Sequence, residues 1–334
     1  MRILIRLLIL LAVLWSAWWW LAASIIDRGA NGWLAARRAE GWQADAAVIA
    51  TSGFPFGLQT EISELSLADP ETGVALRWGH ITVSAPAYWP GYVTLSLPNT
   101  PIELDTPEAS HQIRVQDGRA RLHLHPGPSL QLDHMQTHGG AWQLNSAEGN
   151  VFAGDDWALQ VAQDAEISET YQFDFQVTNL RPGDHLRTRL AVPAEWPLGF
   201  EQFVADLAVT FDRPWDRRAV EVARPQPRHL SLRHAEVAWG PVRLLATAEL
   251  ILDDQGIPNG AANVQVENWA ELLDLAVVGG VLPANIRPQA QAMLGALANM
   301  GGDPTRLDLA LRFDGNEMYL GPIRLGPAPR IVLR

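Results

Sequence analysis

The chain has 334 residues, no cysteine and a formal net charge of −12, with 25 basic residues that are all arginine. The missing cysteines exclude disulfides, thiolate nucleophiles and cysteine-ligated zinc or iron–sulfur centres. The acidic balance repels phosphate backbones, so we expect no nucleic-acid partner.

The first predicted element is a helix over the apolar run from Ile3 to Ile26. A helix needs about 20 apolar residues to cross a bilayer core. Arg2 and Arg6 at its start favour a single-pass anchor in the inner membrane, with the C-terminal region in the periplasm. A cleaved signal peptide is the alternative, although its apolar region is usually shorter. The tryptophans of the run suit an interfacial aromatic belt: Trp15, Trp18, Trp19 and Trp20.

We assign residues 1–45 to the anchor and a juxtamembrane helix, and residues 46–212 to a first β-rich half. Apolar residues in this half recur at spacing two in short runs, as in Phe173, Phe175 and Val177. Such alternation is typical of antiparallel strands with one solvated and one apolar face. No strand–helix–strand repeat is visible, which disfavours a nucleotide-binding fold of parallel strands.

Residues 213–228 are rich in proline and arginine, and we predict a linker there. A second β-rich half follows over residues 229–334 and includes a helical pair at 268–302. Asn268 and Glu271 have the spacing of a capping box at the start of this pair. The predicted fold class is mainly β (β-rich α+β). It is a long curved antiparallel sheet, or an open barrel or groove, with an N-terminal transmembrane helix and a C-terminal helical pair.

The helical pair has one apolar face on each helix, and two interpretations remain open. The pair can cover the sheet as core, or it can line a groove for an irregular apolar ligand. Tryptophans on the strands can likewise belong to the core or to a groove. The candidate groove residues are Trp78, Trp142, Trp157, Trp239, Trp269, Leu273, Val277, Met293, Leu297 and Met300.

The sequence contains no specific catalytic or cofactor motif. His123 and His125 on one strand, with His134 and His138, are the only imidazole cluster to consider, and they fall at polar positions without a carboxylate at ligand spacing. Asp155 and Asp156 precede a strand and indicate a turn rather than a catalytic pair. We therefore predict no catalytic residue, no metal site and no cofactor.

Three segments carry a resemblance to a known family: the turn Gly53–Leu58, the segment Tyr88–Val93 and the terminal segment Leu320–Gly326. Together with the N-terminal anchor they resemble an uncharacterised bacterial envelope family, domain-of-unknown-function family 2125. The layout of an anchor before an all-β exported region is also similar, more distantly, to AsmA-like proteins, which are associated with lipid transport. Neither resemblance supplies catalytic residues.

The leading functional hypothesis is a non-enzymatic periplasmic protein that binds or transfers lipid or another apolar envelope ligand. A structural or scaffolding protein that binds envelope protein partners through its sheet edges is the alternative. An unrecognised envelope hydrolase is the third.

Overall fold

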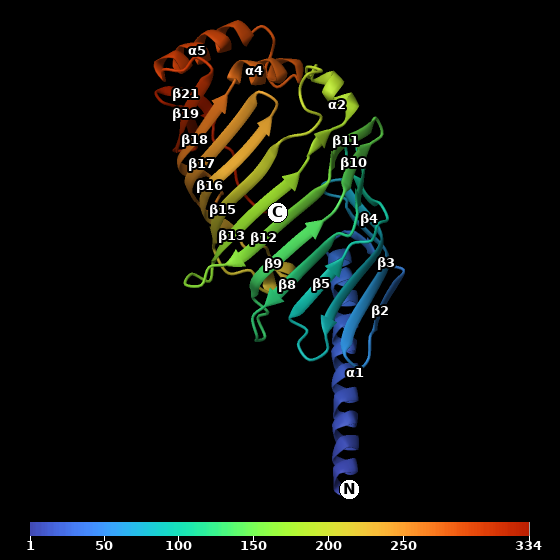
Figure 1. The fold of residues 1–334 in the computed structure, drawn as a ribbon. Coiled ribbons are helices and arrows are strands. Elements are labelled where there is room, and N and C mark those ends of the chain that lie inside the picture. The colour runs from blue at the N-terminus through green and yellow to red at the C-terminus, as the bar shows by residue number, and fades with distance from the viewer. Residues whose placement is uncertain (334) are drawn as a thin grey trace. The chain divides into compact units, whose positions relative to one another are not determined.

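The computed structural model describes residues 1–333 and divides into two compact units. Unit 1 comprises Met1–Leu130 and Thr137–Ala147, and unit 2 comprises Gln131–Gln136 and the chain from Glu148 onward. Both units consist mainly of antiparallel strands (Figure 1), so the predicted β-rich fold class with an N-terminal helix and a C-terminal helical pair is confirmed.

Unit 1 carries the long helix α1 (Arg2–Ala39), which continues well past the apolar run and ends before the predicted limit at Asp45. Its sheet is centred on the long hairpin of β3 and β4, with β1 and β2 paired to β3, and β5 and β6 paired to β4. The remaining pairs are β5 with β8, β6 with β7 and β7 with β10. The strands are β1 (Gln43–Asp45), β2 (Val48–Ser52), β3 (Gly57–Asp69), β4 (Val74–Pro86), β5 (Tyr92–Ser96), β6 (Ile102–Asp105), β7 (Ser110–Val115), β8 (Arg119–Leu124) and β10 (Trp142–Ser146), and β9 (Leu132–Gly139) has residues in both units.

Unit 2 is an antiparallel meander in which β12, β13, β15, β16, β17, β18, β19, β20 and β21 pair in this order, and β11 pairs with β14. The strands are β11 (Gly149–Gly154), β12 (Asp156–Gln163), β13 (Thr170–Thr178), β14 (Arg181–Pro182), β15 (Gln202–Phe211), β16 (Pro227–Trp239), β17 (Val242–Leu252), β18 (Pro258–Glu267), β19 (Arg306–Asp314), β20 (Glu317–Leu320) and β21 (Ile323–Pro327). Two short helices, α2 (Asp184–Arg189) and α3 (Arg218–Glu221), lie in its connections.

The predicted helical pair is present as α4 (Trp269–Val278) and α5 (Arg287–Met300). The predicted capping box is wrong, because Asn268 has a left-handed backbone with φ of 53°. Its side-chain Nδ2 donates to the carbonyl oxygen of Pro241 at 2.5 Å instead. The helices cover one end of the sheet in unit 2, where Trp269, Leu273 and Ala298 pack on Val266 and Leu307.

The division into units differs from the predicted halves. Residues 213–228, which we predict as a linker, lie inside unit 2, where they form most of the connection from β15 to β16 and the first two residues of β16. These two strands pair over nearly their whole length, from Gln202 opposite Ala238 to Phe211 opposite Pro227. Proline and arginine in this stretch therefore belong to a connection within a sheet, which the same composition signals equally well.

Candidate functional site

Helix α1 packs along unit 1 with only part of its length. Its N-terminal turns project beyond the sheet (Figure 1), and every residue from Ile3 to Leu14 is exposed. From Trp15 onward one face of α1 meets the sheet, and the small residues Ala22 and Ala23 are buried against Leu58 and Ala87. Farther along, the hydroxyl of Thr51 on β2 donates to the carboxylate of Asp27 on α1 at 2.6 Å.

Three tryptophans fasten α1 to two loops at one end of the sheet. The indole nitrogen of Trp15 donates to the carbonyl oxygen of Pro55 at 2.9 Å, and that of Trp19 donates to Gly57 at 2.7 Å. The indole nitrogen of Trp18 donates to the carbonyl oxygen of Ala87 at 2.9 Å. These residues occupy one helical face, because positions three and four apart are neighbours on a helix. We call loops 53–56 and 87–91 together the aromatic edge of unit 1.

An apolar pocket of about 330 Å³ lies between α1 and the sheet of unit 1, next to these hydrogen bonds. Two of its polar groups are satisfied internally: the hydroxyl of Thr60 lies 2.8 Å from that of Thr51, and the indole of Trp18 is bonded to Ala87. Its size falls within the range of small-molecule sites in proteins, which are about 300–1,000 Å³ and mostly apolar. The pocket is lined by Trp18, Ala22, Ile25, Ile26, Leu58, Thr60, Val83, Ser84, Ala85, Pro90, Val93 and Leu130.

Unit 2 presents its apolar side chains on one face of the meander. A row of directly paired residues crosses seven strands from β12 to β19, and every member is half-buried. At one side of this row Val266 and Leu307 are covered by α4 and α5, and at the other side Val209, Leu250 and Phe313 are buried. We call this row the apolar band: Leu159, Phe175, Ala205, Ala235, Ala246, Val264 and Leu309.

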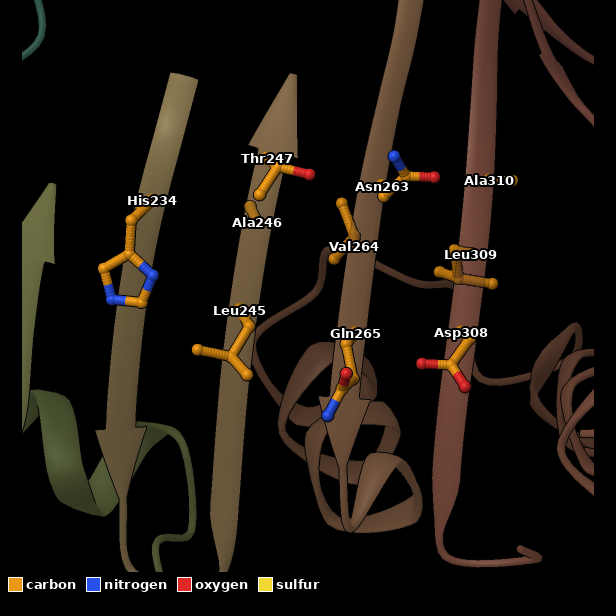
Figure 2. Close-up of a pocket in the computed structure, with 10 residues that line it drawn as sticks. All are labelled: His234, Leu245, Ala246, Thr247, Asn263, Val264, Gln265, Asp308, Leu309 and Ala310. Atoms are coloured by element: carbon orange, nitrogen blue, oxygen red, sulfur yellow. The ribbon is translucent and has the colours of Figure 1, made fainter. Parts of the chain in front are cut away.

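The opposite face of the same strands is polar. Figure 2 shows side chains on three neighbouring strands, among them Leu245, Gln265 and Asp308. The depression that they line is open and has a volume of about 390 Å³. Its charged groups are paired, since His234 lies 3.4 Å from Glu236 and Asp308 lies 3.2 Å from Arg306. The Arg306–Asp308 pair is exposed and contributes little to stability.

The sequence profile of a bacterial family, described as uncharacterized protein conserved in bacteria (DUF2125), matches residues 19–329. The chain belongs to this family. No curated protein and no solved structure is significantly similar to it. In this DUF2125 member, the match begins at Trp19, within the face of α1 that contacts the aromatic edge.

The polar residues singled out in the sequence of this DUF2125 member are dispersed. Within residues 1–333, no three histidine, aspartate or glutamate side chains are grouped to hold a metal ion. The ring of His123 lies 4.6 Å from that of Tyr92, its partner across β5 and β8. Asp155 accepts hydrogen bonds at 2.6 Å from Arg181 and Asn179, and these bonds hold the pKa of Asp155 below its usual value. This carboxylate ties a turn to a strand.

The ten candidate groove residues are placed apart from the apolar pocket of unit 1, which none of them lines. Trp269 and Leu273 of α4 and Leu297 of α5 pack in the core between these helices and the sheet. Trp239 packs edge-on against Trp196. Met300 and Met293 are exposed, at 84% and 40%. The others are half-buried, with Trp78 on β4 and Trp142 on β10 in unit 1, and with Trp157 on β12 and Val277 on α4 in unit 2.

Sequence reasoning assigned the tryptophans of the anchor to a lipid interface and the Gly53–Leu58 and Tyr88–Val93 segments to turn chemistry. In the structure the two features are in contact, because the indoles of Trp15, Trp18 and Trp19 donate hydrogen bonds to backbone carbonyl groups in or next to those turns. A signal for this was present in the sequence. Both turns carry aromatic residues and no charge, which is unusual for exposed loops.

Proposed function

We propose that this protein is a membrane-anchored component of the bacterial envelope that binds or transfers lipid, without catalysing a reaction. The observation that carries the proposal is the apolar pocket between α1 and the sheet of unit 1. The pocket adjoins a helix that is long and apolar enough to cross a membrane. Its ligand would be an acyl chain that leaves the bilayer beside α1.

The physical driving force is the burial of apolar surface. Each methylene that moves from water to an apolar site gains about 0.8 kcal/mol. An acyl chain that starts in the bilayer gains much less, because it is already in an apolar environment. Occupancy of the pocket therefore depends on how well its shape fits the acyl chain and on the absence of unsatisfied polar groups in its wall. The bonded Thr60 and Trp18 groups keep the pocket wall compatible with an acyl chain.

The apolar band of unit 2 supports transfer rather than binding alone. Its seven strands, spaced by about 4.8 Å, give it a length of roughly 29 Å. A half-buried apolar surface of this length can shield an extended acyl chain from water. The large apolar side chains of the band are Leu159, Phe175, Val264 and Leu309, and the small ones are alanines.

Location in the inner membrane, with both units in the periplasm, is part of the proposal. Arg2 and Arg6 before the apolar run support this orientation through the positive-inside rule. The packing of α1 supports a retained anchor, because Ala22, Ala23 and Leu34 are buried on unit 1. Removal of α1 by a signal peptidase would expose Leu58 and Ala87.

The test compares lipid bound to the full chain and to a variant with a filled pocket. Ala85→Trp places an indole in the pocket, and Ala85→Leu fills it partly with less risk to folding. Ala261→Trp is the matched control, because Ala261 is exposed on the polar face of β18. Each protein is purified in mild detergent, and its bound lipid is quantified by native mass spectrometry.

Lipid that surrounds α1 is common to all four proteins, so the difference between them reports the pocket. We expect a defined stoichiometry of tightly bound lipid in the wild type and in Ala261→Trp, with a partial loss in Ala85→Leu and a complete loss in Ala85→Trp. Equal lipid in the wild type and in a folded Ala85→Trp protein would refute lipid binding at this pocket.

A further inference from the structure

The length of α1 that projects freely is too short to cross a bilayer. Ile3 to Leu14 are twelve residues, which span about 18 Å at 1.5 Å per residue. The hydrocarbon core of a bilayer is about 30 Å thick, so a crossing that starts at Ile3 needs about 20 residues and extends to about Ala22. The face of α1 that points away from unit 1 remains apolar over this length, since Trp20 and Leu21 are 69% and 45% exposed.

The aromatic edge lies beside α1 within that length. Its contacts fall at Trp15, Trp18 and Trp19, which precede Ala22 by three to seven residues, or about 5–10 Å along the helix. Large aromatic side chains project from both loops. Phe56 is 80% exposed and Phe54 is 55% exposed in the first loop, and Tyr88 is 70% exposed in the second. Water is a poor environment for these side chains, whereas a membrane interface favours them.

Several backbone polar groups of the aromatic edge have hydrogen-bond partners within the protein, which lowers the cost of moving them into an apolar environment. An unsatisfied carbonyl group in hydrocarbon costs several kcal/mol, so irregular loops at membrane depth need internal hydrogen-bond donors. The indoles of α1 supply donors to Pro55, Gly57 and Ala87. The amide nitrogen of Gly57 also donates to the carbonyl oxygen of Gly53, and that of Ala87 donates to Phe56.

The two ends of the sheet in unit 1 differ in charge. Neither loop 53–56 nor loop 87–91 contains an ionisable acid or base apart from the tyrosine hydroxyl. At the opposite end, Asp69 ends β3 and Glu71 lies in the β3–β4 turn, while Asp105 ends β6 and Glu108 lies in the β6–β7 turn. Asp105 is paired with Arg77 on β4, and the other three carboxylates make this end acidic. An acidic end is repelled by anionic lipid, whereas the charge-free end can be dehydrated at low cost.

We infer that the aromatic edge of unit 1 inserts into the bilayer leaflet beside α1, so that Phe54, Phe56 and Tyr88 contact phospholipid acyl chains about 5–10 Å below the headgroup boundary. The protein thus has a second membrane contact besides its span. This contact places the Trp18 end of the apolar pocket at the level of the acyl chains and its Ile26 end just outside the hydrocarbon core. The inference rests on the crossing of the membrane by α1, which the proposed function includes.

The test uses the absence of cysteine in the natural sequence. Single cysteines are introduced into the full chain as Phe56→Cys, Tyr88→Cys, Leu8→Cys and Glu108→Cys, and each is labelled with an environment-sensitive fluorophore. The proteins are reconstituted into phosphatidylcholine vesicles that carry a quenching spin label near the headgroup end or near the terminal methyl of the acyl chain. Leu8 reports the crossing of α1, and Glu108 reports the acidic end.

We expect the probes at positions 56 and 88 to be quenched several-fold more than the probe at position 108, and most strongly by the label near the headgroup end. Position 8 lies about 8 Å inside the hydrocarbon core from the other boundary, at 1.5 Å per residue after Ile3, so its probe should be quenched above the level of position 108 by both labels. Quenching at position 8 with none above the level of position 108 at positions 56 and 88 would overturn the inference while leaving the anchor intact. Absence of quenching at position 8 would instead remove the anchor, and with it the proposed function.

Discussion

The indole nitrogen of Trp19 lies 2.7 Å from the carbonyl oxygen of Gly57, and this hydrogen bond connects helix α1 to the first residue of β3. The next residue, Trp20, is 69% exposed on another side of the helix. Two adjacent tryptophans therefore differ in role: Trp19 is hydrogen-bonded to the sheet, whereas Trp20 faces the surroundings of the protein.

Replacement of Trp19 by phenylalanine should weaken the attachment of α1 to unit 1. The change retains a ring but removes the donor, and a buried carbonyl group that loses its partner costs about 1–3 kcal/mol. The free energy of unfolding of the full chain in detergent micelles, followed by near-ultraviolet circular dichroism, measures the loss. Trp20→Phe is the matched control and should have little effect. Equal stability of the two variants would contradict the role of the hydrogen bond.

The candidate groove residues Trp269 and Met300 should respond differently to truncation. Trp269 is 7% exposed and donates to the carbonyl oxygen of Pro304 at 3.0 Å, whereas Met300 is 84% exposed. Trp269→Ala should destabilise unit 2 by about 3–5 kcal/mol, because large-to-small changes in a core leave a cavity. Met300→Ala should change stability by less than about 0.5 kcal/mol. Chemical denaturation of both variants measures these values, and a large loss in Met300→Ala would show that its side chain is covered.

The hydroxyl of Tyr171 is a buried junction in unit 2. It accepts hydrogen bonds from the backbone nitrogen of Trp215 at 3.1 Å and from the side-chain amide of Gln163 at 3.2 Å, and it donates to the carbonyl oxygen of Leu132 at 3.3 Å. Burial raises the pKa of this hydroxyl. Tyr171→Phe removes all three bonds and should cost about 1–3 kcal/mol. Thermal or denaturant unfolding checks this value. Tyr88→Phe, at a side chain that is 70% exposed, should leave unit 2 unchanged.

Asp155 predicts a small dependence of stability on pH. Its pKa is lowered in the folded protein by hydrogen bonds from Arg181 and Asn179, so the folded state binds the proton more weakly than the unfolded state. The stabilisation is therefore complete above the ordinary aspartate pKa of about 3.9 and is lost as pH falls through the lowered folded pKa. Because the carboxylate is 47% exposed, the gain is below about 1 kcal/mol.

The pH dependence of the unfolding free energy in the wild type and in Asp155→Asn measures this contribution. The two proteins should differ at neutral pH and converge in strong acid. Arg181→Ala should remove most of the same difference, since it removes the main hydrogen-bond donor. A difference that persists unchanged into strong acid would assign the effect of Asp155→Asn to packing instead.

The sequence by itself determined the local elements of this protein. The apolar run after Ile3 predicts a membrane-length helix, the alternation at Phe173, Phe175 and Val177 predicts a strand, and the 268–302 pattern predicts two helices. These features depend on residues a few positions apart, whose periodicity matches the geometry of a helix or a strand. The capping box failed because Asn268 bonds to Pro241, a residue 27 positions away.

Only the tertiary structure decided which distant segments meet. Strand pairing brings the loop at Gly53–Phe56 and the loop at Ala87–Gly91 to the same end of one sheet, and α1 docks there through indoles separated from their acceptors by 38 to 69 residues. The same pairing leaves Met300 exposed and covers Trp269, although both lie on apolar helical faces. Composition and period are properties of short segments, whereas a pocket is a property of their register and packing.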